Sequence, residues 1–299
     1  MAKPSRLAVS GTAAAIALLI AGHPTARAAD TTERAPTSMY AAQHLAGYLD
    51  PAERPDSVLL VPQPPVEGTA RFAADVEGYK ATRALRDTPR WRLAEIDADV
   101  RFPHAANTFA CALGVPIDAT STPRTYELLE RTVVDAGQST YAAKEKYQRP
   151  RPFAMFPEPI CVPGDADRLR SNGSYPSGHA SLGWTWALLL AELAPERANA
   201  LLARGYAYGE NRVICGVHWP TDVEAGRTIA AAVFAKLHSK PEFIGQMQAA
   251  RDELRRARAA TTTRAPDCSL ERAALGEAPG TPSHAALDPA LRPAIQASR

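Results

Sequence analysis

Apolar side chains recur at helical spacing through the middle of the chain. Repeats at three and four residues predict helices over residues 71–85, 91–100, 125–134, 177–192 and 221–238. Strand-like alternation of apolar and polar residues is scarce in the same region. The pattern therefore predicts an all-α fold, a helical bundle in which these segments bury their apolar faces against one another.

The stretch of residues 180–194 is apolar, with Glu192 as its only charged residue. A membrane-spanning helix needs about 20 predominantly apolar residues. The stretch is shorter than that and mixed in composition, so we expect a buried core helix and no membrane span in the mature chain.

The N-terminus has the pattern of an export signal. Lys3 and Arg6 precede a stretch of small apolar residues that ends near Gly22, and Ala26 and Ala28 bracket a small-x-small cleavage site. We expect residues 1–28 to be a signal peptide that directs the protein to the periplasm or the medium. An uncleaved membrane anchor is the alternative.

Two flanking regions differ from the helical domain, which we place at residues 68–255. Residues 29–67 are rich in proline and predict an extended arm, with one short helix near residues 40–48. Residues 256–299 are dominated by Arg, Ala, Thr and Pro and predict a disordered tail.

Charge and cysteine content narrow the class further. The net charge of +2 becomes −1 when the three basic residues of the leader are removed, and no basic cluster suggests a nucleic-acid partner. All four cysteines lie in the mature part, and an exported protein meets an oxidising compartment. One or two disulfides are expected, and three full pairings remain open. The cysteine spacing matches no zinc pattern, and we expect no metal site.

Three short segments carry candidate chemistry. They are KEKYQRPRP (144–152), GSYPSGH (173–179) and RVICGVHWPTD (212–222). The second precedes an apolar helix, which Ser177 can cap while Gly178 lets backbone N–H groups approach a ligand. A helix N-terminus favours an anion, and His179 lies at its rim. Alone, this segment equally fits an ordinary capped helix.

In the third segment, Asp222 follows His218 by four residues. A carboxylate at that spacing can hold one ring nitrogen and leave the other free to attack an electrophile. The alternative is a core histidine paired with a capping aspartate. Lys144, Arg151 and Arg212 are unremarkable singly, but together they match the charge of a phosphate.

Together the segments resemble the signature of the type 2 phosphatidic-acid phosphatase superfamily, K-x6-RP…PSGH…SR-x5-H-x3-D, in order and in spacing. The strings GSYPSGH, LLARGYAYG and RVICGVHW are similar to the bacterial class A non-specific acid phosphatases, and the resemblance covers residues 40–245. It implies a metal-independent, cofactor-free acid phosphatase that hydrolyses small-molecule phosphomonoesters, and it leaves open whether phosphotransfer to alcohols occurs as a side activity. Related enzymes commonly form homo-oligomers.

The resemblance also implies a role for each matching residue. His218 would be the nucleophile that forms a phosphohistidine, with Asp222 orienting it. His179 would protonate the leaving oxygen and then activate water. The phosphoryl oxygens would be bound by Lys144, Arg151, Ser177, Gly178 and Arg212.

One position departs from the family pattern: Asn211 stands where serine usually precedes the arginine of the third segment. We expect it to affect Arg212 without abolishing activity. The alternatives are a vanadium haloperoxidase, a membrane lipid phosphatase, a cysteine phosphatase using Cys215, and an inactive phosphate-binding module. The first is disfavoured by the class A strings, the second by the lack of apolar spans, and the third by the missing C-x5-R loop. The intact histidines and Asp222 argue against the last.

Overall fold

The computed structural model describes residues 46–260 and 266–276, and these residues form helices and loops with no strand. The all-α prediction is confirmed. The α-helices are α1 (Ser57–Leu60), α2 (Ala70–Ala81), α3 (Pro89–Ile96), α4 (Ala110–Leu113), α5 (Pro123–Gln138), α6 (Tyr141–Tyr147), α7 (Pro152–Met155), α8 (Ala166–Arg170), α9 (Gly178–Leu193), α10 (Ala198–Ile214), α11 (Pro220–Leu237), α12 (Pro241–Ala259) and α13 (Ser269–Leu275). Short 3-10 helices are η1 (Pro51–Glu53), η2 (Thr82–Leu85), η3 (His104–Phe109), η4 (Pro163–Asp165) and η5 (Pro195–Arg197).

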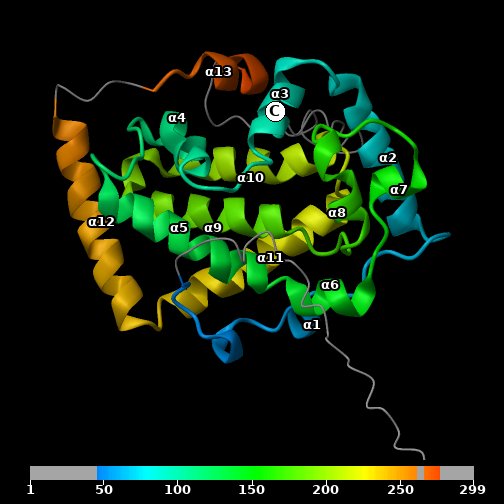
Figure 1. Cartoon of the computed structure of the whole chain (residues 1–299), viewed down its shortest axis with the longest axis horizontal. Coiled ribbons are helices and arrows are strands. Elements are labelled where there is room, and N and C mark those ends of the chain that lie inside the picture. Colours follow the sequence, from blue (N-terminus) through cyan, green and yellow to red (C-terminus); the bar gives the residue numbers. More distant parts are fainter. Residues whose placement is uncertain (1–45, 261–265, 277–299) are drawn as a thin grey trace, which may run out of the picture. The chain divides into compact units, whose positions relative to one another are not determined.

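Helix α9 forms the centre of the bundle. It packs against α10, α11 and α5, and α12 runs across the bundle beside α5 (Figure 1). The indole of Trp186 on α9 is fully buried, and its Nε1–H donates to the Leu129 carbonyl of α5 at 3.0 Å. Burying an aromatic ring of this size contributes a few kcal/mol, and the satisfied N–H removes the cost of a buried donor.

The apolar stretch at residues 180–194 is the core helix that the sequence predicts, since most of its side chains are buried. Among the described residues, no helix combines the length and apolar character needed to cross a bilayer.

Five predicted helices occur where the sequence places them, with different ends. Helix α3 stops at Ile96, four residues before the predicted end, and residues 97–100 form a turn and a loop. The apolar periodicity in the sequence extends to Val100, because this side chain is also buried although it lies outside the helix. Apolar periodicity reports burial, and a loop under the core produces the same signal.

The predicted arm folds onto the bundle over the part that the structure describes. The backbone N–H groups of Tyr48 and Leu49 donate to the Asp135 carboxylate on α5 at 2.8 and 3.0 Å, and both residues are buried. Residues 46–48 are not helical, and η1 and α1 follow. The arm is therefore less extended than predicted. The predicted signal peptide and the first part of the predicted helix at 40–48 lie outside the described residues.

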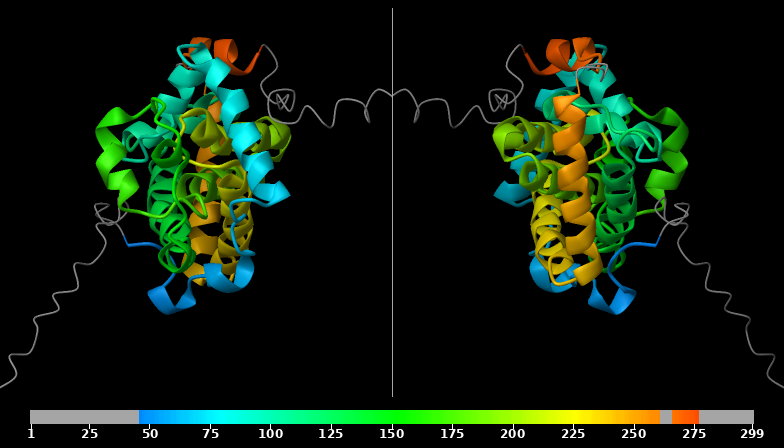
Figure 2. Two further views of the ribbon diagram at one scale, coloured as in Figure 1. Left: turned by 90° about the vertical axis from the view of Figure 1, so that its right-hand side faces the viewer. Right: turned by 90° about the vertical axis from the view of Figure 1, so that its left-hand side faces the viewer.

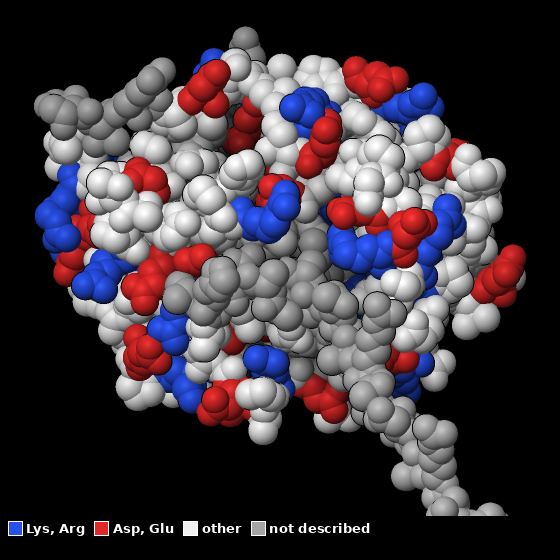
Figure 3. Space-filling model, in the orientation of Figure 1, with Lys and Arg blue, Asp and Glu red and all other residues white. Residues whose placement is uncertain are grey.

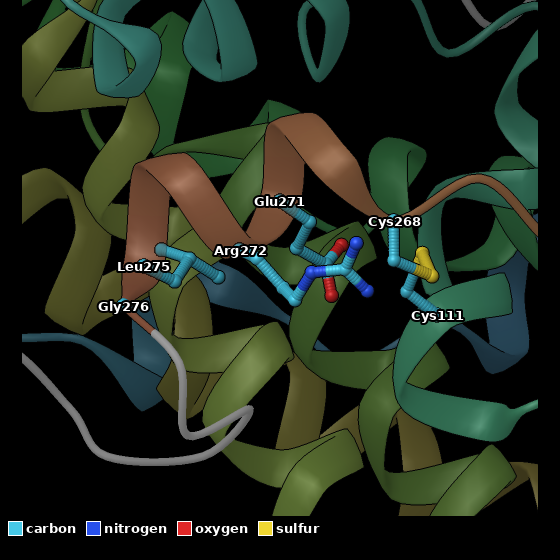
Figure 4. A pocket seen from close by; sticks show the side chains of 6 residues that line it. All are labelled: Cys111, Cys268, Glu271, Arg272, Leu275 and Gly276. Carbon is cyan, nitrogen blue, oxygen red and sulfur yellow. A yellow bond between two sulfur atoms is a disulfide. The ribbon is translucent and has the colours of Figure 1, made fainter.

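The predicted disordered tail is wrong for residues 266–276. Helix α12 continues to Ala259, and α13 packs against α3 (Figures 1 and 2). A disulfide joins Cys268, at the start of α13, to Cys111 (Figure 4). Beside this bond lies a pocket of about 140 Å³ that is also lined by Glu271, Arg272, Leu275 and Gly276. The disulfide and the ion pair of Glu271 with Arg204 supply the anchoring that composition does not reveal.

The second disulfide joins Cys161 to Cys215, so the structure selects one of the three pairings that the sequence leaves open. On the face shown in Figure 3, acidic and basic side chains of the described residues are interspersed. Ion pairs among the described residues include Arg131 with Glu242 and Lys240 with Glu53.

The two disulfides are expected to have separable effects. Replacing Cys111 and Cys268 by alanine opens a loop spanning 157 residues, which should lower the free energy of unfolding by roughly 2–4 kcal/mol. Replacing Cys161 and Cys215 should lower stability as well, and should also reduce kcat, because Cys215 is three residues from His218. Urea unfolding and steady-state kinetics of both variants test this. An unchanged urea midpoint in the first variant would contradict it.

Candidate active site

The three chemistry-bearing segments converge at one end of α9. Lys144 lies on α6, and Arg151 is the N-cap residue of α7. Ser177 caps α9, which places His179 in its first turn, and Arg212 lies in the last turn of α10. His218 precedes α11 and Asp222 is in its first turn. Every candidate residue is buried, so the side chains share a site largely screened from water.

A tight turn between α10 and α11 presents His218 to this site. Gly216 has φ of +87°, a conformation that L side chains rarely adopt, and a Cβ there would lie 2.8 Å from the Arg83 guanidinium. Arg83 donates in turn to the carbonyls of Val213 and Ile214 at 2.8 and 2.6 Å. The Cys161–Cys215 disulfide ties the same turn to the loop before α8. The turn is therefore fixed on both sides.

Side chains on both sides orient the ring of His218. Its Nδ1 lies 3.1 Å from Oδ2 of Asp222, and its Nε2 lies 3.1 Å from Nη1 of Arg151. A guanidinium can only donate, so Nε2 accepts and the proton of the neutral ring sits on Nδ1, where it is donated to Asp222. The lone pair of Nε2 consequently points at the Arg151 guanidinium.

A backbone carbonyl group orients the ring of His179. Its Nε2 lies 3.0 Å from the carbonyl oxygen of Ala98, which can only accept, so Nε2 carries a proton. The second nitrogen, Nδ1, is then the one that takes up or releases a proton. The two histidines thus differ in the ring nitrogen that remains for chemistry.

Three cations surround the histidines. Nζ of Lys144 donates to the Gly173 carbonyl at 2.8 Å, and Nε of Arg151 donates to the Leu169 carbonyl at 2.8 Å. The positive charge of Arg212 acts on both His179 and His218, so it lies within electrostatic range of each ring. Buried positive charges of this number favour a ligand with at least two negative charges.

The start of α9 completes the anion site. Oγ of Ser177 accepts from the Ala180 N–H at 3.2 Å, and the Ser177 N–H donates to the Asp222 carbonyl at 2.8 Å. Gly226 of α11 packs closely here, since a Cβ would lie 2.5 Å from the Ser177 carbonyl oxygen. These contacts fix the first turn of α9, which includes Gly178 and whose free N–H groups favour an anion.

Burial and charge hold the pKa of both histidines well below its usual value. Desolvation is the largest cause in each case. Arg212 adds to it for His179, and Arg151 and Lys144 add to it for His218. Desolvation, followed by Arg151, also lowers the pKa of Lys144. Both rings are therefore neutral near neutral pH.

Two residues of the site are absent from the sequence prediction. Arg149 donates from Nη1 to Asp222 and from Nη2 to Asp75 of α2, each at 2.6 Å. Arg149 lies in the first segment, but the motif does not mark it. Asp75 shares the buried face of α2 with Tyr79, and a carboxylate on such a face needs a buried partner. That placement is the signal that could have revealed it.

Asn211 is fully buried, and its side-chain amide donates to Asp97 at 2.7 Å. Asp97 also binds Arg204 through both oxygens, at 2.6 and 2.9 Å. The residue after Asp97 is Ala98, the hydrogen-bond partner of His179. Asn211 thus belongs to the support of the loop behind His179, and its effect on Arg212 stays a prediction.

Within residues 46–260 and 266–276, no group of three or more His, Cys, Asp and Glu side chains is placed to hold a metal ion. The described site instead gathers cations, two histidines and a helix N-terminus, an arrangement suited to binding and transferring a phosphoryl group.

Comparison with known proteins agrees with this chemistry. Residues 131–243 match the family model described as the PAP2 superfamily. The chain is 45% identical over 207 residues to a non-specific acid phosphatase of Providencia stuartii, covering 69% of this chain and 84% of the relative. It is 40% identical over 208 residues to a non-specific acid phosphatase of Salmonella typhimurium, covering 69% and 83%. An acid phosphatase of Zymomonas mobilis is 38% identical over 222 residues, covering 73% and 83%.

Proposed function

The chain belongs to the bacterial non-specific acid phosphatases of the PAP2 superfamily, and from this premise we propose that it works through a phosphohistidine on His218. The observation that carries the proposal is the placement of the His218 ring, with Asp222 at one nitrogen and Arg151 at the other. The substrates are small-molecule phosphomonoesters.

In the first step Nε2 of His218 attacks phosphorus in line. The N–P bond forms as the bond from phosphorus to the leaving oxygen breaks, and His179 gives that oxygen a proton. The ring of His218 becomes positively charged, and Asp222 stabilises it through the Nδ1–H. Lys144, Arg151, Arg212 and the start of α9 neutralise the charge on the other phosphoryl oxygens.

In the second step a water molecule attacks the phosphoenzyme. His179, now neutral, takes a proton from that water, the N–P bond breaks, and inorganic phosphate leaves with His218 neutral again. An alcohol that replaces water would accept the phosphoryl group by the same route, which is the origin of a phosphotransferase side activity.

The lowered pKa of both histidines favours an acid optimum. His218 must be neutral to attack, and burial with Arg151 keeps it neutral even in mild acid. His179 must be protonated to act as an acid, and its lowered pKa means that this requires low pH. A bound phosphate dianion offsets the charge of Arg212 and assists that protonation. The two rings interact, so the observed pKa values belong to the pair.

Export to the periplasm or the medium is part of the same proposal. It rests on the pattern of residues 1–28, and the two disulfides fit an oxidising compartment.

We expect purified protein to hydrolyse p-nitrophenyl phosphate at acid pH with full activity in EDTA, because cations of the chain supply the charge stabilisation. Vanadate should inhibit, since its trigonal-bipyramidal form resembles the transition state. The measurement is the steady-state rate with EDTA, vanadate, and added zinc or magnesium. Activity that EDTA removes and a divalent metal restores would overturn the proposed mechanism.

A further inference from the structure

We propose that Asp75 and Arg149 are positioning residues of the phosphatase reaction, a charge-balancing pair that orients Asp222 and sets the electrostatic environment of His218. The inference rests on the proposed role of His218 as the nucleophile. Neither residue belongs to the motif that marks the site, and both reach His218 only through Asp222 and the start of α11.

Arg149 bridges two carboxylates. Its Nη1 donates to Oδ1 of Asp222 and its Nη2 donates to Oδ2 of Asp75, each at 2.6 Å. The side chains of Arg149, Asp75 and Asp222 are 5%, 1% and 0% exposed. Buried charges of this kind are stable only as a paired set, so the three groups act as one unit.

Asp75 is fastened to the helix that carries Asp222. Its Oδ1 accepts the Thr221 N–H at 2.9 Å, and its Oδ2 accepts the Thr221 hydroxyl at 2.6 Å. Thr221 in turn accepts from Arg149 at 2.9 Å. Helix α2 is thereby joined to the first turn of α11, and Arg149 is hydrogen-bonded to both helices.

The two oxygens of Asp222 serve different partners. Oδ1 faces Arg149, whereas Oδ2 accepts from His218 at 3.1 Å and from the Trp219 N–H at 2.9 Å. Occupation of both oxygens fixes the rotation of the carboxylate. Arg149 therefore holds the oxygen that orients the nucleophile in place.

The pair also sets the charge next to His218. Two carboxylates and one guanidinium leave one net negative charge in the unit. Without the Asp75 charge the unit is neutral, and without the Arg149 charge it has two negative charges. A positive His218 ring is favoured by negative surroundings, so the two losses should move its protonation in opposite directions.

Other charged groups surround this unit and stay the same in the test. The groups that act on His218 are Arg151, Lys144, Arg212, His179 and Asp222. Glu224 interacts with Asp75 and Tyr175 with Asp222, while Arg71 acts on both Glu224 and Tyr175, and Tyr147 acts on Tyr175. None of them is altered by a substitution at position 75 or 149.

The test is the pH dependence of kcat/KM for Asp75→Asn, Arg149→Gln and the variant with both substitutions. The acid limb is the fall of kcat/KM at low pH. Two phosphomonoesters with different phosphate pKa values distinguish a limb that belongs to the substrate from the limb that belongs to the enzyme, where His218 must lose its proton. Asp75→Asn should move that limb down by about one pH unit, and Arg149→Gln should move it up by a similar amount. The double variant removes one charge of each sign and should return the limb toward that of the parent.

Glu253→Gln is the matched control. Glu253 on α12 accepts the N–H and the hydroxyl of Thr125 at the start of α5, as Asp75 does for Thr221 at the start of α11. The control should lower stability without moving the limb. Asp75→Glu keeps the charge, so its acid limb should coincide with that of the parent even where kcat falls. If Arg149→Gln fails to fold, the comparison of Asp75→Glu with Asp75→Asn still tests the proposal.

Limbs that stay in place, or that move in the same direction in both single variants, would overturn the charge-balancing role. So would an Asp75→Glu limb that moves as far as that of Asp75→Asn. His218→Ala separates the two proposals: an inactive His218→Ala enzyme with unmoved limbs refutes only the pair, whereas an active one refutes the nucleophile.

Discussion

His218→Ala is expected to lower kcat for every phosphomonoester by about 10⁴-fold or more. The nitrogen that forms the covalent bond is lost, and no other described nucleophile lies between Asp222 and Arg151. Phosphate binding should persist, because Lys144, Arg151, Arg212 and the start of α9 are unchanged. Steady-state rates for alkyl and aryl phosphates, together with a phosphate-binding titration, measure both effects.

His238→Ala is the matched control for that substitution. His238 lies at the opposite end of α11, where it bonds to the Phe234 carbonyl and to Glu192. Helix α11 has 18 residues, which separates its ends by about 27 Å. The control should keep kcat within about twofold of the parent. Substantial activity in His218→Ala would rule out double displacement through this residue.

The bundle could be predicted because its central helices have strong apolar periodicity. Helix α9 was predicted within one residue at each end, since apolar side chains occupy nearly all of its surface. Helix α10 was not predicted, although it packs against α9 along its length. It contains Gly205 and Gly209, which weaken a helix by about 1 kcal/mol each relative to alanine.

Those glycines are explained only by tertiary structure. A Cβ on Gly205 would lie 2.3 Å from the Cβ of Ala187, so close packing against α9 requires the missing side chain. Helix α13 was not predicted for a related reason. None of its seven residues is buried, and the Cys111–Cys268 disulfide links its start to the rest of the domain.

Sequence spacing indicated some contacts of the candidate site and missed others. Spacing alone indicated the His218–Asp222 contact, because a residue just before a helix lies within reach of a carboxylate in its first turn. It could not indicate Asp75, which lies 147 residues before Asp222 and reaches it through Arg149. Long-range contacts between polar groups leave no periodic trace, so the pairing of Asp75 with Arg149 required the structure.

His179→Ala should separate substrates by their leaving groups. An alkyl phosphate needs its leaving oxygen protonated, so we expect the rate of its first step to fall by about 10³-fold. p-Nitrophenolate leaves without a proton, and its first step should suffer much less. The structure supports this division because the Ala98 carbonyl holds Nε2 of His179 and leaves Nδ1 for proton transfer. Single-turnover rates on both substrates provide the comparison.

The same substitution should expose the covalent intermediate. His179 also activates water, so with p-nitrophenyl phosphate the second step becomes limiting and phosphorylated enzyme accumulates. A phosphohistidine is labile in acid, so labelled enzyme is quenched at alkaline pH and digested, and we expect the label on His218. Cys215 is bonded to Cys161, and Ser177 accepts from the Ala180 N–H as a helix cap. A label on either residue, or equal loss of rate for both leaving groups, would show that the roles of the two histidines are assigned wrongly.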